Sequence, residues 1–161
     1  MYEGDLKDLY WAENHIIKAL PKMAKAAASA ELETAFTKHL AQAHTHVSRL
    51  KKVFAVSGLE VGSKKCEAMD GLTKEGAEVI EDHAKGRVRD AGLIIAAPMV
   101  EHYEISAYGS LRALAEVMGF EEAAETLQET LDEEAKTDKL LSGLAETIKQ
   151  EAFTEAVKEE N

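Results

Sequence analysis

Apolar residues recur at every third or fourth position through four long stretches of the chain, and this spacing predicts amphipathic helices. The four predicted helices span residues 5–29, 31–57, 88–118 and 121–150. Residues 66–83 carry the same spacing but are interrupted by Gly71 and Gly76, which predicts a shorter helix inside the longest connection. Gly58 and Gly119 follow the second and third long stretches, where a glycine commonly ends a helix.

The order of these elements predicts an all-α fold. A tightly linked helix pair, a connection that holds the short helix and a second tightly linked pair are the plan of a ferritin-like antiparallel four-helix bundle with one long crossover. We expect residues 1–161 to form a single domain of this kind. Pro21 and Pro98 fall inside two of the long helices, and each is expected to kink its helix because it removes a backbone hydrogen bond.

Composition and charge argue against several classes of protein. Apolar residues make up 45% of the chain, which is enough to build a core and excludes a disordered protein. A net charge of −11 argues against binding to nucleic acid or to an anionic membrane surface, and the longest uncharged run, residues 91–100, is too short to span a bilayer. Because the single cysteine, Cys66, cannot form an internal disulfide and the charged start of the chain is unlike a signal peptide, we expect a cytoplasmic protein.

Three of the long helices carry acidic residues inside their apolar stripes, namely Glu13, Glu101 and Glu134. A buried carboxylate is costly unless it is paired, and several converging carboxylates need a shared partner, most simply a metal ion. Glu104 lies one turn beyond Glu101, and Asp138 one turn beyond Glu134, so both can reach the same site. The alternative for any one of them is an edge position, from which the side chain reaches solvent or pairs with a basic residue.

The second long helix contributes histidines. His44 follows Leu40 by four positions and precedes Val47 by three, so the spacing predicts that it faces the core, either as a nitrogen ligand or as a hydrogen-bonded core residue. The same count places His39 and His46 on a flank, facing solvent or an interface. Carboxylates with imidazole suit iron or manganese, one or two ions per chain. The predicted metal ligands are Glu13, His44, Glu101, Glu104, Glu134 and Asp138.

Several segments resemble the YciF-type bacterial family of ferritin-like proteins, among them LKDLYWAENHIIKALPKMAKAA, EHYEI and the pattern CxAMxGL. The resemblance covers nearly the whole chain. It implies a four-helix core with an extra short helix, a homodimer, a connection with bacterial stress responses and a dinuclear metal site similar to that of rubrerythrins. Separately from the resemblance, Tyr10, Tyr103 and Tyr108 stand near the acids; they either hydrogen-bond the ligands or are core aromatic residues with satisfied hydroxyl groups.

This chain departs from the family in the second helix. Family members carry one or two acidic residues in the stretch that ends here at His44, whereas this chain has Ala41 and Gln42. The Glu-x-x-His pair of a di-iron helix would then be reduced to Ala41-x-x-His44. A site that lacks one carboxylate would bind its ions weakly or stay empty.

Two hypotheses about function follow. The first is a ferritin-like stress-response protein in which a dinuclear iron or manganese site has a redox or metal-handling role. The second is a non-enzymatic, dimeric structural protein whose metal site is degenerate or empty. No feature of the sequence specifies a reaction, a catalytic residue or a small-molecule substrate.

Overall fold

The structure, a computed structural model, describes the backbone of residues 1–159 and the side chains of residues 1–154. Its helices are α1 (Tyr2–Ala26), α2 (Ala30–Val56), α3 (Glu67–Asp82), α4 (Arg87–Val117) and α5 (Glu121–Glu159). No strand occurs within residues 1–159, so the prediction of an all-α fold is confirmed. Residues 160 and 161, which the sequence analysis assigns to the same domain, lie outside the described part.

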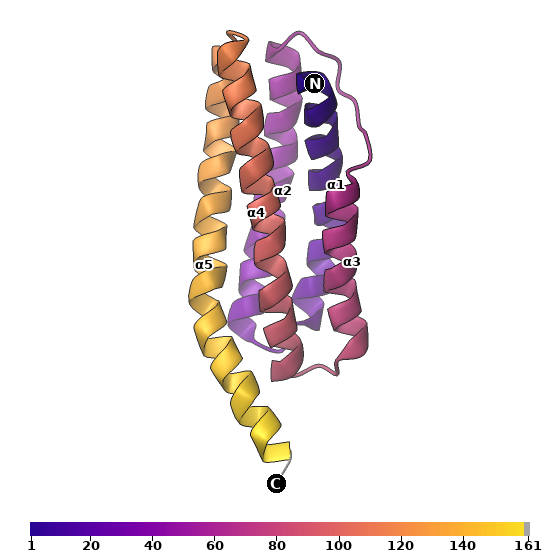
Figure 1. The fold of residues 1–161 in the computed structure, drawn as a ribbon, viewed down its shortest axis with the longest axis vertical. Helices are drawn as coiled ribbons and strands as arrows, with labels where there is room; N and C mark the ends of the chain where they lie inside the picture. Colours follow the sequence, from indigo (N-terminus) through magenta and orange to yellow (C-terminus); the bar gives the residue numbers. More distant parts are fainter. Residues whose placement is uncertain (160–161) are drawn as a thin grey trace.

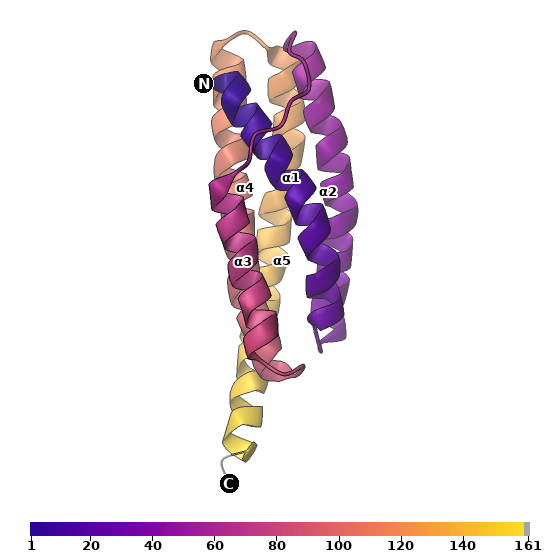
Figure 2. The ribbon, with the colours of Figure 1, turned by 90° about the vertical axis from the view of Figure 1, so that its right-hand side faces the viewer.

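The four long helices form an antiparallel bundle (Figure 1). Helices α1 and α5 each pack against both α2 and α4. The crossover from α2 runs along the outside of the bundle and leads into α3, which lies against α1 and α4 (Figure 2). The predicted bundle, with one long crossover that contains an additional short helix, is therefore confirmed. Helix α5 extends beyond the ends of its neighbours in both views.

Two glycines end long helices as the sequence predicts. Gly58 and Gly119 have φ angles of 70° and 76°, a conformation that suits a residue without a Cβ atom. Just beyond each helix, backbone N–H groups bond back to carbonyl groups of the last turn, which satisfies the helix end. Pro21 and Pro98 do not end their helices, because α1 and α4 continue on both sides of them.

The turn between α1 and α2 is fixed by a residue from α4. Helix α1 ends at Ala26, three residues before its predicted end. The buried carboxylate of Asp90 accepts hydrogen bonds from the backbone N–H groups of Ala28 and Ser29, each at 2.7 Å. The Ser29 hydroxyl then caps α2. These amides bond across the bundle instead of continuing α1, so a contact distant in sequence sets the helix boundary.

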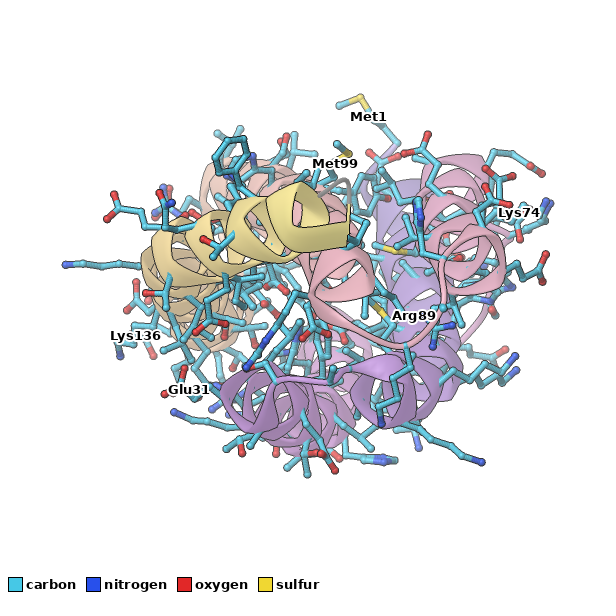
Figure 3. All side chains as sticks on the ribbon, turned by 90° about the horizontal axis from the view of Figure 1, so that it is seen from below. Met1, Glu31, Lys74, Arg89, Met99 and Lys136 are labelled. Atoms are coloured by element: carbon cyan, nitrogen blue, oxygen red, sulfur yellow. The ribbon has the colours of Figure 1, made fainter. Side chains whose placement is uncertain are left out.

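Side chains divide the bundle into an apolar interior and a charged surface. Phe36, Phe54 and Leu50 are almost completely buried, whereas Lys74 and Lys136 extend outward from α3 and α5 (Figure 3). Met99 is an exposed apolar residue on α4. Among the described helices, none combines the length and the apolar character needed to cross a membrane.

Candidate metal centre

The middle of the bundle contains four buried acidic side chains. Glu13 from α1, Glu101 and Glu104 from α4, and Glu134 from α5 are each at most 2% exposed. Each occupies a position in the apolar stripe of its helix, so burial follows from the helical repeat that also buries the neighbouring leucines and alanines. The structure thus brings together four of the six residues predicted from the sequence.

Helix α2 supplies two histidines that the sequence analysis placed elsewhere. His39 and His46 are 3% and 0% exposed, and their separation of seven residues puts them two turns apart on one face. His44 is exposed, so the prediction that it faces the core is wrong. The predicted face was counted from Leu40, which is only half-buried. The buried face runs through Phe36, Ala43 and Leu50, but it is centred toward His39 and His46 and leaves His44 outside.

The position on α2 where an inward acid is missing also differs from the predicted one. Ala41 is exposed and Gln42 is half-buried, so neither stands where an inward acid would be. Ala43 is fully buried and precedes His46 by three residues. The Glu-x-x-His pair is therefore reduced to Ala43-x-x-His46, and His39 lies one turn before Ala43 on the same face.

Asp138 is not brought into the group of buried acids. It is partly exposed, and its Oδ1 lies 3.1 Å from Nε2 of the exposed His102. The difference from Glu134 follows from the four-residue step, because four residues advance the helix by more than one full turn and carry the side chain toward the edge of the buried face.

The buried acids and histidines form two groups that share one residue. In each group, one ligand atom per residue lies within 4.8 Å of the corresponding atoms of the others. Glu134 belongs to both groups. The first group consists of His39, Glu101, Glu104 and Glu134, and the second of Glu13, His46 and Glu134. Together, these six residues from four helices are called the carboxylate–histidine centre below.

The Glu134 carboxylate lies between the two imidazoles. Its Oε1 is 2.9 Å from Nδ1 of His46, and its Oε2 is 3.6 Å from Nε2 of His39. His46 Nδ1 is also 3.3 Å from Oε1 of Glu13, and His39 Nδ1 is 2.9 Å from Oε1 of Glu101. One oxygen of Glu134 is thus directed toward each of the two groups.

A layer of residues outside the centre holds two of its members. Nε2 of His46 lies 2.9 Å from Oε2 of Glu133, and Arg49 donates two hydrogen bonds of 2.9 Å to the Glu133 carboxylate. The Tyr108 hydroxyl donates a hydrogen bond of 2.5 Å to Oε1 of Glu13. Tyr108 therefore contacts a centre residue, as predicted, whereas the Tyr103 hydroxyl donates to Asp8 outside the centre.

The carboxylates make both buried imidazoles strong bases. Burial by itself would lower the pKa of His39, but the charge and hydrogen bonding of Glu101, with further carboxylates, raise it to about 9. For His46, burial is likewise outweighed by contacts with Glu13 and Glu134, which raise its pKa to about 10. Hydrogen bonds from Arg49 lower the pKa of Glu133 to about 2. The carboxylates of the centre thus surround two imidazoles that carry positive charge at neutral pH.

The acids of the centre differ in their affinity for protons. Burial raises the pKa of Glu101 to about 8, although His39 opposes this shift. Burial and the surrounding carboxylates raise the pKa of Glu104 well above its usual value. Burial acts in the same direction on Glu134, but the close contact with His46 and the charges of both imidazoles lower its pKa. The residue shared by the two groups is therefore held as a carboxylate.

Many polar atoms of the centre lack a hydrogen-bond partner. Buried donors and acceptors are normally satisfied, so such a concentration requires an explanation. The short imidazole–carboxylate distances on Glu134 do not have the alignment of hydrogen bonds. The unpartnered atoms are Oε2 of Glu13, Nε2 of His39, Nδ1 of His46, Oε2 of Glu101, and both carboxylate oxygens of Glu104 and of Glu134.

Comparison with known proteins identifies relatives across nearly the whole chain. The family model described as Domain of unknown function (DUF892) matches residues 1–154. Protein YciF of Escherichia coli (strain K12) is 47% identical over 141 residues, which cover 87% of this chain and 85% of YciF.

Two solved structures share the fold. The crystal structure of the E. coli stress protein YciF matches with a TM-score of 0.88 and 43% identity, covering 93% of this chain and 98% of that chain. The structure of YcfI from Rhodopseudomonas palustris matches with a TM-score of 0.85 and 38% identity, covering 88% of this chain and 90% of that chain. The bundle, including the crossover helix, is thus an architecture that these proteins have in common.

Proposed function

The chain belongs to the DUF892 family and is related to the stress protein YciF, and from this premise and the geometry of the centre we propose that it carries a dinuclear site for iron or manganese. The proposed function is a redox or metal-handling role associated with stress. One observation carries the proposal: six buried acidic and imidazole side chains from four helices meet around Glu134. Burying so many ionisable groups together is costly unless they share a charged partner.

The residues of the centre fit divalent ions of this kind. Iron(II) and manganese(II) accept carboxylate oxygens and imidazole nitrogens, and these are the atoms that lie buried without hydrogen-bond partners. One ion would be held by His39, Glu101 and Glu104, and the second by Glu13 and His46. Glu134 would serve both ions. Such ions, when bound, supply one-electron redox chemistry.

The surrounding residues prepare the centre for this role. Once His46 loses a proton, as a metal ligand must, Nε2–H donating to Glu133 would leave the lone pair on Nδ1, which faces Glu13 and Glu134. The two hydrogen bonds from Arg49 hold Glu133 in place. This arrangement orients one imidazole nitrogen toward the carboxylates without help from a bound ion.

Metal content of histidine variants tests the proposal. The untagged protein, loaded anaerobically with iron(II) or manganese(II) and then desalted, is expected to retain up to two equivalents per chain, measured by elemental analysis. His39→Gln and His46→Gln should each weaken binding by more than about 10-fold, because each removes a ligand rather than an outer contact. His44→Gln, on the exposed face of the same helix, should bind like the parent protein.

This comparison separates a built site from adventitious binding. Less than one retained equivalent in the parent protein, or equal losses in His39→Gln and His44→Gln, would contradict the proposal. Helical circular dichroism of each variant provides the control for folding.

A metal-free structural role is the second candidate, and the contacts inside the centre favour it. His39 Nδ1 and Glu101 Oε1, and His46 Nδ1 and Glu134 Oε1, are each 2.9 Å apart, so ligand atoms already face one another. Ala43 also occupies the position where a di-iron helix carries an acid. Under this candidate, the imidazoles take the place of metal ions and the bundle acts through its surface.

Proton release on metal binding distinguishes the two candidates. Ligands must lose their protons to bind a cation, and raised pKa values of about 9 for His39 and about 10 for His46 leave both imidazoles protonated at neutral pH. Adding metal to a weakly buffered solution should therefore acidify it, as read with a pH indicator. Because raising the pH removes competing protons, affinity should rise steeply from about pH 6 to about pH 8. An affinity independent of pH would contradict the first candidate.

A further inference from the structure

A small cavity adjoins one side of the carboxylate–histidine centre. It has a volume of about 20 Å³, enough for one water-sized molecule. Most of its wall is apolar and includes Ile16, Leu20 and Ala97, and its polar lining comes from residues that include His39 and Glu101. The cavity thus touches the first of the two ligand groups.

Next to this cavity, the surface between α1 and α3 is hollowed. A wider groove of about 240 Å³ opens there, and it shares Ala19, Met23 and Thr73 with the cavity. Helices α1 and α3 lie side by side in the bundle (Figure 2). Ala19, Met23 and Thr73 therefore stand between the groove at the surface and the cavity beside the centre, and this route, which has α3 on one side, is called the passage below.

Two unpartnered polar atoms belong to residues at the buried end of this passage. Nε2 of His39 and Oε2 of Glu101 have no hydrogen-bond partner, although these residues are only 3% and 2% exposed. A cavity lined in part by residues that carry such atoms differs from a packing defect, whose walls would be apolar throughout. The passage therefore ends on groups that can interact with an incoming molecule.

We propose that the passage between α1 and α3 admits a small, uncharged molecule of the size of dioxygen or peroxide to the His39–Glu101 side of the centre. This inference rests on the proposed function, because it supplies the reactant of a redox site. The apolar wall selects for a neutral molecule, since an ion would lose its hydration without gaining a partner there. Three lysines, Lys18, Lys22 and Lys74, line the outer groove against one acid, Asp70, which is paired with Lys74. This excess of positive charge disfavours entry of a metal cation by the same path.

Dioxygen itself is the probe for this passage, and no metal is needed. In the metal-free full-length protein under dioxygen pressure, paramagnetic relaxation of methyl NMR signals reports where the gas resides. Ile16 and Leu20, which line the cavity, should relax several-fold faster than the equally buried Leu127 on α5. Ala19→Leu, which fills the point shared by cavity and groove, should reduce that enhancement several-fold.

Two further variants make the test decisive. Thr73→Leu obstructs the same point from α3 and carries the test if Ala19→Leu fails to fold. Ala107→Leu is the matched control, since Ala107 is also half-buried and lines a different hollow, near Asp8. Equal enhancement in the parent protein and both obstructed variants, or no excess at Ile16 and Leu20, would overturn the inference. Metal content is measured separately, so failure of the proposed metal site would remain distinguishable.

Discussion

Glu134→Gln is expected to abolish retention of both metal equivalents, whereas Asp138→Asn, the same acid-to-amide change one turn further along α5, should leave metal binding unchanged. The reason is position, since Glu134 is completely buried and belongs to both ligand groups. Asp138 is partly exposed and lies beside His102. The sequence offers both acids as ligands, and the structure separates them.

The expected loss of metal affinity in Glu134→Gln is large because Glu134 belongs to both ligand groups. Changes to groups that only touch a ligand typically cost about 10–100-fold in affinity, so loss of a carboxylate common to two ions should exceed about 100-fold for each. Anaerobic competition against a chelator of known affinity measures this change. The amide keeps the size of the side chain but removes the negative charge between His39 and His46.

The Glu134 comparison has clear opposing outcomes. If Glu134→Gln retains two equivalents, the centre does not bind metal through its shared residue and the dinuclear proposal fails. If Asp138→Asn loses as much affinity as Glu134→Gln, the assignment of ligands from burial is wrong. Helical circular dichroism and urea unfolding of both variants show whether any loss reflects unfolding instead.

Glu104→Leu is expected to stabilise the metal-free protein while weakening metal binding. Both carboxyl oxygens of Glu104 are buried without a hydrogen-bond partner, and an unsatisfied buried polar group costs about 1–3 kcal/mol. Leucine has a similar volume and no polar atoms, so the metal-free protein should gain about that much. Urea unfolding should show a higher midpoint with an unchanged slope.

The gain from Glu104→Leu should depend on pH in a defined direction. The folded protein raises the pKa of Glu104, so in the parent protein the folded state binds more protons than the unfolded state above about pH 4.3. Parent stability therefore falls with rising pH from that point until the folded-state pKa is reached. Glu104→Leu removes this contribution, and its advantage should grow by up to about 1.4 kcal/mol per pH unit within the window.

Glu104→Gln is the matched control for this experiment. Glutamine cannot ionise, so it also removes the pH-dependent contribution, but its amide remains buried among groups that offer few partners. It should therefore be less stable than the leucine variant at every pH. A leucine variant less stable than the parent protein at neutral pH would show that Glu104 has favourable partners in the metal-free state.

These two experiments address the same conflict between folding and function. The centre concentrates buried ionisable groups, which disfavour folding, at the place where the proposed ions would bind. If the protein has a purely structural role, leucine at position 104 should leave its function intact. A metal-binding protein should gain stability there at the expense of its site.

The acidic half of the centre was predictable from the sequence, and the imidazole half was not. Glu13, Glu101 and Glu134 stand inside long, regular stripes where several leucines and alanines fix the buried face. On α2 the stripe is wide, and residues at adjacent positions are partly or fully buried around it. Successive residues point about 100° apart, so a small error in the predicted buried face of α2 is enough to place His44 inside and His39 and His46 outside.

The sequence by itself determined the all-α bundle, its crossover helix and the glycine helix ends, because these follow from local periodicity and backbone preference. Only the tertiary structure decided which side chains share the interior. Packing against α1 and α5 selects the face of α2, and Asp90 of α4 fixes the turn that precedes it. These choices depend on contacts between residues far apart in the chain, and a spacing rule within one helix carries no information about them.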